Sequence, residues 1–199
     1  MAMARSYHTY EVRNMMQKAE GAASPVTGAP AHSRVLHAQS VGGGEGTTPA
    51  LMMARTHKGA DESNKQFSNR GGTTRTSAFG NLLHQSEAVC QALNSTKGQL
   101  ALGVFDDKNH AAKKLRATIE FGPVKEGTLF SNAVNSPMKT VHKSDVSIQK
   151  PSGGAAGVRV ILDRGANQAV FHIQTCMPLD TMPACKYEVK EGDTLIAGG

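Results

Sequence analysis

The first third of the chain places apolar residues at helical spacing, between turns rich in Gly and Pro. Within residues 7–20 apolar side chains recur every three or four positions, which predicts a first helix. Residues 32–39 predict one or two further helical turns. Thr48 and Pro49 have the residue types of an N-cap and a first helical position, so a third helix is predicted over 50–57.

The middle of the chain predicts two more helices and one segment of undecided type. Residues 79–93 carry a broad apolar face, and Thr76 or Ser77 would cap the helix they form. Residues 100–105 are an apolar run whose composition favours a strand, while its period does not separate strand from helix. Residues 109–121 predict an amphipathic helix.

The last third changes to the alternating pattern of strands. Residues 146–149, 158–162 and 169–176 alternate or are rich in β-branched side chains, and residues 165–167 predict a hairpin turn. Residues 186–189 predict an added edge strand. Helices first and antiparallel strands later predict the α+β class, with N-terminal helices followed by a small antiparallel sheet.

Charge and cysteine content narrow the function classes. The 199 residues carry a net charge of +6, which favours a polyanionic partner such as nucleic acid. The cysteines Cys90, Cys176 and Cys185 have neither a zinc spacing nor a disulfide framework. Cys90 is expected to be a buried small hydrophobe, and a Cys176–Cys185 bridge stays open. No apolar run is long enough to span a membrane, and no signal-peptide core is present.

Histidine and arginine side chains gather where acid–base chemistry on a phosphate would need them. His32, His37 and His57 bracket a segment that also contains Arg34 and Arg55. Histidine transfers protons near neutral pH, and arginine donors match phosphate oxygens. For any one of these histidines, an ordinary surface position is the simpler reading, and only the group favours catalysis.

The last predicted strands add further candidates. On a strand His172 and Gln174 share one face, and Thr175 points to the other. Thr175 lies at the strand end, where its hydroxyl would leave the core and meet a phosphate. The predicted helix over 109–121 has a basic side that would contact an RNA backbone. Its cations are Lys113, Lys114 and Arg116.

Taken in order, these segments resemble a known family. The chain contains His32-Ser-Arg-Val-Leu-His37, then Arg55, then Ser77-Ala-Phe79, and last Phe-His-Ile-Gln-Thr-Cys-Met-Pro over 171–178. This set is similar to the ribonuclease A-like (BECR-type) toxin domains of bacterial contact-dependent inhibition proteins and other polymorphic toxins. The resemblance covers about residues 30–180, and it implies a small α+β ribonuclease that needs no disulfides.

The resemblance also implies roles for individual residues. His37 would be the general base or acid, Arg55 would hold the phosphate, and Thr175 would contact phosphate or base. Met177 stands where the family has a tyrosine, and Pro and Ala precede His32 in place of two glycines. The second proton-transfer group would then come from His57 or His172. His32 is a further catalytic candidate.

The function expected from this resemblance is RNA cleavage by acid–base catalysis without a metal or other cofactor. The chain would be a toxin, secreted or delivered within a larger effector, that acts in the cytoplasm of a target bacterium. Its partners would be RNA and a cognate immunity protein. Residues 1–30 would be an N-terminal helix and linker, residues 31–199 the nuclease domain, and residues 58–75 a loop that a partner orders.

Two alternatives remain at this point. The N-terminal histidines also fit a ββα-metal DNase of the His-Asn-His type, in which a strand histidine is the base and a helix histidine binds a divalent ion. The expected loop Asn and a carboxylate ligand beside His37 are absent. The second alternative is a non-catalytic basic module that binds nucleic acid.

Overall fold

The computed structural model describes residues 5–38, 46–48, 51, 55, 61–63, 65–66, 75–124, 138–142, 148–149, 157–179 and 183–199. The helices are α1 (Thr9–Ala19), α2 (Ser33–His37), α5 (Leu82–Asn94), α6 (Thr96–Asp106) and the short 3-10 helix η1 (Lys108–His110). The strands are β1 (Arg75–Phe79), β2 (Leu115–Phe121), β3 (Met138–His142), β4 (Ile148–Gln149), β5 (Gly157–Arg164), β6 (His172–Leu179), β7 (Lys186–Glu191) and β8 (Thr194–Gly198).

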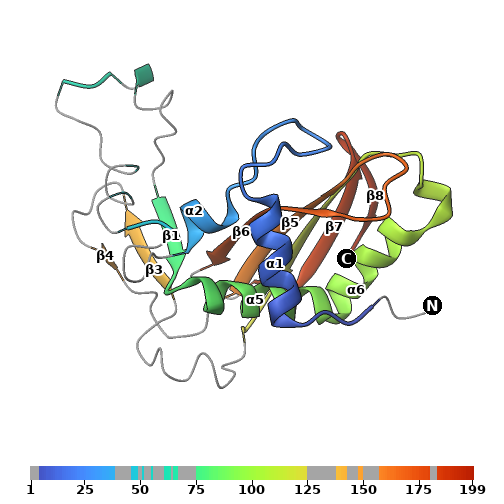
Figure 1. Cartoon of the computed structure of the whole chain (residues 1–199), viewed down its shortest axis with the longest axis horizontal. Helices are drawn as coiled ribbons and strands as arrows, with labels where there is room; N and C mark the ends of the chain where they lie inside the picture. The colour runs from blue at the N-terminus through green and yellow to red at the C-terminus, as the bar shows by residue number, and fades with distance from the viewer. Residues whose placement is uncertain are drawn as a thin grey trace.

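Two antiparallel sheets organise these strands (Figure 1). The larger has the order β6-β5-β2-β7-β8, and the smaller has the order β1-β3-β4. Helices α5 and α6 pack on one face of the larger sheet, and α1 packs beside α5. The predicted α+β class, with N-terminal helices and a small antiparallel sheet, is confirmed.

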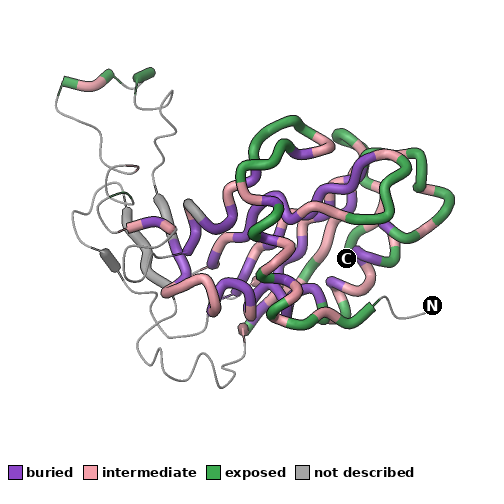
Figure 2. Tube along the Cα trace, in the orientation of Figure 1, coloured by how far each residue is buried: buried purple, intermediate pink, exposed green. Residues whose placement is uncertain are grey.

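The core lies between these helices and the larger sheet. Alternate residues of β2 and β5 point into this core and are fully buried. They are Leu115, Ala117, Ile119, Val158, Val160 and Leu162. Helix α1 adds Val12 and Met16 to the same cluster, and the buried segments of Figure 2 follow this arrangement. The proposed division of the chain near residue 30 stays a prediction.

The first two helix predictions are confirmed, because α1 and α2 lie within the expected ranges. The predicted cap of the third helix is also present. The Thr48 hydroxyl accepts a hydrogen bond from the Leu51 backbone N–H at 3.2 Å, and Leu51 and Arg55 are both helical. Pro49 and His57 lie outside the described residues.

The expected cap of helix α5 is wrong. Thr76 and Ser77 belong to strand β1, and Asn81 caps α5 by accepting a hydrogen bond from the His84 backbone N–H at 2.8 Å. Strand β1 pairs with β3, which follows about sixty residues later in the chain. Local sequence pattern does not contain that long-range partner.

The undecided segment 100–105 is helical, as part of α6. Ser95 begins that helix, because its side chain accepts a hydrogen bond from the Gly98 backbone N–H at 3.0 Å. The buried residues Ala101, Leu102 and Phe105 then follow helical spacing.

The predicted helix over 109–121 is wrong. The chain forms η1 and then β2, which lies between β5 and β7 and pairs with both. Inward-facing residues alternate with outward-facing ones along most of β2. Pairing on both sides satisfies its backbone groups in the sheet, and this overrides the helical propensity of its polar side chains.

The C-terminal strands confirm most of the β prediction. Strands β4, β5 and β6 occupy the expected segments, and Asn167 takes the left-handed conformation, at φ 59°, in the predicted turn. Residues 186–189 are in β7, but β7 is not an edge strand, because β8 lies outside it. The pattern missed β8.

Candidate functional site

The predicted histidine segment and the last predicted strand lie side by side. Helix α2 packs against β6, the edge strand of the larger sheet, and also against β1 (Figure 1). The backbone N–H of His32 donates a hydrogen bond to the carbonyl oxygen of Gln174 at 3.3 Å. Just after α2, Ala38 forms a parallel bridge with Phe79. The segments that the sequence analysis joined through a resemblance are therefore neighbours in the fold. We call this region the α2–β6 edge, which comprises residues 29–38 and 172–176.

Two imidazole rings face each other at the α2–β6 edge. The ring centroids of His32 and His37 are 5.7 Å apart, at an interplanar angle of 46°. His32 is half-buried and His37 is buried. Hydrogen-bonding reach is about 3 Å from each ring nitrogen. The distance between the two rings is therefore of the size that one phosphate group could bridge.

The tautomer of His32 follows from its surroundings. Its Nδ1 lies 3.3 Å from the carbonyl oxygen of Pro30. A carbonyl oxygen only accepts hydrogen bonds, so Nδ1 carries the proton in this contact. The Nε2 atom of the neutral ring is then an acceptor. This tautomer leaves the lone pair of Nε2 for accepting a proton.

A β-bulge in β6 sets which way the strand residues point. Ile161 pairs with Thr175, whereas the next residue of β5, Leu162, pairs with Ile173. Gln174 is therefore the extra residue of the bulge. Because paired residues share a face, Thr175 and His172 both lie on the face opposite the core. The expectation that they point to opposite faces is wrong, since the bulge shifts the alternation.

Thr175 is buried, and its hydroxyl has no hydrogen-bond partner among the residues that the structure describes. A buried hydroxyl without a partner is costly, by about 1–3 kcal/mol. His172 begins β6 and pairs in register with Asp163. Its Nε2 is also buried without a partner in the described part of the chain.

The two predicted arginines differ in exposure. Arg34 lies in α2 and is buried, and its backbone N–H donates to Glu20 Oε2 at 2.8 Å. Arg55 is half-buried, and burial lowers the pKa of its guanidinium. The backbone N–H of Thr47 donates to the carbonyl oxygen of Ala38 at 2.7 Å, so the segment that carries Arg55 starts beside the end of α2.

The predicted basic helix face is wrong, because its residues follow η1 and enter β2. Arg116 donates two hydrogen bonds of 2.7 Å to the carboxylate of Asp163, which is fully buried. Lys113 pairs with Glu191 at 2.9 Å. Lys114 is exposed. The charges of Arg116 and Lys113 are therefore balanced by carboxylates of the protein itself.

Arg116 lies on the same face of the larger sheet as Thr175 and His172. We call the part of this face that β2, β5 and β7 form the open face. Six of its residues line a pocket of about 290 Å³. They are Thr118, Glu120, Arg159, Ile161, Lys186 and Glu188. Arg159 bonds Glu120 at 2.5 and 2.8 Å, and Lys190 pairs with Glu188 at 3.0 Å. Cations and carboxylates thus alternate across the open face.

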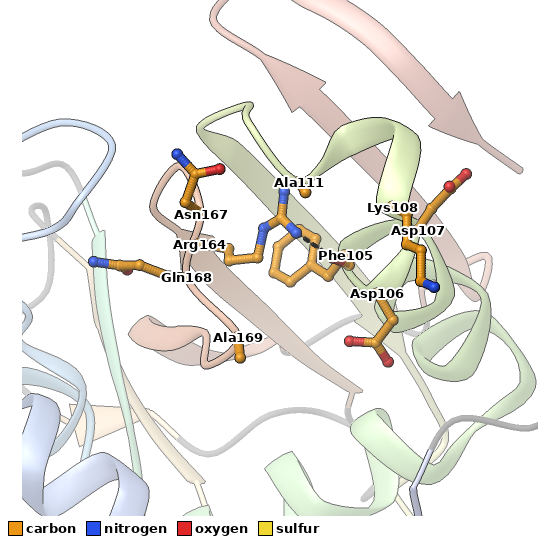
Figure 3. Close-up of a pocket in the computed structure, with 9 residues that line it drawn as sticks. All are labelled: Phe105, Asp106, Asp107, Lys108, Ala111, Arg164, Asn167, Gln168 and Ala169. Carbon is orange, nitrogen blue, oxygen red and sulfur yellow. Dashed lines mark hydrogen bonds between the residues drawn. The ribbon is translucent and has the colours of Figure 1, made fainter.

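A second pocket, of about 390 Å³, lies where α6, η1 and the turn between β5 and β6 meet (Figure 3). Arg164 lies in it above the ring of Phe105. Its guanidinium donates to the backbone carbonyls of Phe105, His110 and Lys113. These bonds tie the end of α6 to the turn before β2. The role of Arg164 is therefore structural.

Sequence reasoning missed three residues that support α2. Gln85 donates to the Ser33 carbonyl oxygen at 2.6 Å, Glu20 accepts from the backbone of Arg34, and Gln174 contacts the residues before His32. The thiol of Cys176 is buried beneath them, and burial raises its pKa. Each partner is distant in sequence, so no local signal could have identified these residues.

The described residues contain no cluster of three or more His, Cys, Asp or Glu arranged to hold a metal ion. The same part of the chain has no helix long and apolar enough to cross a membrane. Its cysteines Cys90, Cys176 and Cys185 are free, and Cys90 is buried as expected. Comparison of the chain with protein-family models, curated proteins and solved structures gives no match.

Proposed function

We propose that the chain cleaves RNA by acid–base catalysis at the α2–β6 edge. The observation that carries the proposal is the His32–His37 pair, with ring centroids 5.7 Å apart and one tautomer set by the Pro30 carbonyl oxygen. Two imidazoles at this separation suit a reaction that removes one proton and supplies another on the same phosphate.

In the proposed reaction His32 Nε2 accepts the proton of a ribose 2′-hydroxyl. The 2′-oxygen attacks phosphorus, and the bond to the 5′-oxygen of the next nucleotide breaks. Protonated His37 gives its proton to that leaving oxygen. The products are a 2′,3′-cyclic phosphate and a free 5′-hydroxyl. In a second step His37 takes a proton from water, the water oxygen attacks phosphorus, and the bond to the 2′-oxygen breaks. His32 then returns its proton to that oxygen, which leaves a 3′-phosphate.

Two further residues would stabilise the charge that develops on the phosphate. The half-buried guanidinium of Arg55 has lost part of its hydration, and it would gain more from a phosphate than an exposed arginine would. The Thr175 hydroxyl, buried and without a partner among the described residues, would donate to a phosphate oxygen or to a base. His57 and His172 remain candidates of the sequence analysis without an assigned step.

The biological setting that fits this activity is that of a bacterial toxin domain. The resemblance to polymorphic toxins supports it, and so does the net charge of +6, which favours RNA. A toxin of this kind would be delivered into a neighbouring bacterium and would act in its cytoplasm. The producing cell would need an immunity protein, and an acidic surface on that protein would complement the basic chain.

The test incubates the purified chain with total bacterial RNA and with plasmid DNA, each in EDTA and in Mg²⁺, beside His37→Ala. RNA loss that persists in EDTA and disappears in the variant is the expected result. DNA cleavage only with Mg²⁺ would favour the metal-nuclease alternative, although His37 lies in helix α2 and that alternative needs a strand histidine. Intact RNA and DNA in every lane would favour a binding module.

A further inference from the structure

We propose that Gln174 is a positioning residue that sets the His32–His37 pair against Thr175. The inference rests on the proposed function, since it concerns the same site. Gln174 is one residue from Thr175 in β6, and it is bonded to the chain just before His32. It is therefore the direct covalent and hydrogen-bonded link between the two halves of the α2–β6 edge.

Gln174 uses both its side chain and its backbone to hold the approach to α2. Its side-chain Nε2 donates to the carbonyl oxygens of Pro30 at 3.1 Å and Ala29 at 3.3 Å. Its own carbonyl oxygen accepts from the His32 backbone N–H at 3.3 Å. Three residues just before α2, namely Ala29, Pro30 and His32, are thus bonded to a single strand residue.

The attachment also reaches the imidazole of His32. The Pro30 carbonyl oxygen that receives the Gln174 amide also lies 3.3 Å from His32 Nδ1. A carbonyl oxygen has two lone pairs and can accept both bonds. Gln174 therefore holds the Pro30 carbonyl oxygen in place, and that oxygen in turn selects the tautomer of His32.

The bulge explains why this residue can make these contacts. A regular strand would place residue 174 in register with Leu162, which is buried in the core. The bulge leaves Gln174 without a partner on β5, so its side chain is free to turn toward residues 29 and 30. Bulges of this kind re-aim side chains beside functional sites.

Other supports of α2 hold its backbone. Glu20 and Gln85 bind the Arg34 N–H and the Ser33 carbonyl oxygen, and Gln85 and Ser33 also contact the Cys176 thiol of β6. None of these bonds reaches the carbonyl oxygens of residues 29 and 30 that Gln174 holds. Loss of Gln174 would therefore change the distance between Thr175 and the histidines, in addition to loosening the loop.

The chain supplies a matched control in Gln99. Its Nε2 also donates to two backbone carbonyls, those of Leu93 at 2.9 Å and Arg5 at 3.4 Å. Gln99 lies in α6, which packs on β2, β7 and β8, whereas α2 packs at the β6 edge of the sheet (Figure 1). Gln99→Met and Gln174→Met remove the same kind of contact, and only the second removes it at the site.

The experiment measures kcat and KM for RNA cleavage, thermal stability, and the NMR resonances of the His32 and His37 rings in wild type and both variants. A displacement of reacting groups by about 1 Å costs about 100-fold in rate. We expect Gln174→Met to lower kcat by at least tenfold, to leave KM within about twofold, and to move the ring resonances. Gln99→Met should leave kcat and the resonances unchanged at a similar loss of stability.

An equal effect of the two variants on kcat, or unmoved ring resonances in Gln174→Met, would show that Gln174 serves only the fold. If wild type does not cleave RNA, the proposed function fails, and the resonances still decide whether Gln174 positions the rings. If Gln174→Met does not fold, Gln174→Asn replaces it, because a side chain shorter by one methylene keeps the amide but shortens its reach to residues 29 and 30. Its kcat should fall in the same direction, and an unchanged kcat would overturn the proposal.

Discussion

The α2–β6 edge and the open face both carry residues predicted to contact RNA, and they differ in what their polar groups bind. On the open face, Arg116 and Arg159 are bonded to the carboxylates of Asp163 and Glu120. At the α2–β6 edge, His32 is bonded to a neutral carbonyl, and Thr175 has no partner among the described residues. A cation that already pairs with a carboxylate attracts a phosphate only weakly. The two arginines of the open face are therefore neutralised by carboxylates of the protein, whereas the Thr175 hydroxyl is bound by no described residue.

The first way to test this contrast is to remove the proposed base. General acid–base catalysis contributes about 10²- to 10⁴-fold to a rate, so His32→Ala should lower kcat for RNA cleavage by that order. His32 is only half-buried, and stability should change little. The kinetics are compared with His8→Ala, a histidine at the start of α1. Equal rates for the two variants would remove His32 from the mechanism.

The second test acts on the open face and should affect stability instead. Arg116→Ala leaves the fully buried carboxylate of Asp163 without its cation, and breaking a buried pair costs about 3 kcal/mol or more. Arg159→Ala breaks a more exposed pair and should cost about 1 kcal/mol or less. Urea denaturation measures both. Similar losses in the two variants would show that burial of Asp163 does not distinguish the pairs.

The third test separates function from stability at one position. Thr175→Val keeps the shape of the side chain and removes the hydroxyl that has no partner in the described chain. Stability should rise by about 1 kcal/mol, because a buried polar atom without a partner is lost. Cleavage should fall by about tenfold or more, since a hydrogen bond to a charged group is worth about 1.5–3 kcal/mol. Unchanged cleavage would mean that the hydroxyl does not meet the substrate.

The smallest effect is expected for the ion pair between Lys113 and Glu191. Both side chains are substantially exposed, at 37% and 42%. Lys113→Ala should therefore change the free energy of unfolding by about 0.5 kcal/mol or less, with cleavage unaltered at moderate salt. Denaturation and RNA cleavage are measured together. A large loss of cleavage would instead show that Lys113 contacts RNA, as the sequence pattern predicts.

The elements that the sequence predicted are those determined locally. Helix α1 and the hairpin of β5 and β6 follow from side-chain period and turn residues, and Thr48 caps its helix as its residue type indicates. Strands β1 and β2 were missed because their partners lie far along the chain. In both cases tertiary pairing outweighs local propensity.

The features of the candidate site also divide into those that the sequence predicts and those that it does not. Four residues separate His32 from His37 within one short segment, so their proximity could be expected from sequence. The orientation of Thr175 could not, because it depends on a bulge that no residue type announces. The partners of Arg116 and Lys113 lie 47 and 78 residues away. The local sequence therefore shows a cluster of cations without the carboxylates that neutralise them, and it indicates an RNA-binding surface.

The contacts of Gln174 have a consequence for synthesis of the chain. The bonds from Gln174 to Ala29 and from Ser24 to Asp163 span 145 and 139 residues. A ribosome that has reached residue 160 has already made both histidines, but not Gln174, which holds the residues before His32. Long-range contacts of this kind form late in folding. A truncated or unfinished chain would therefore contain the proposed catalytic rings without an assembled site, and the cell that makes the protein would meet the active form only after β6 has been translated.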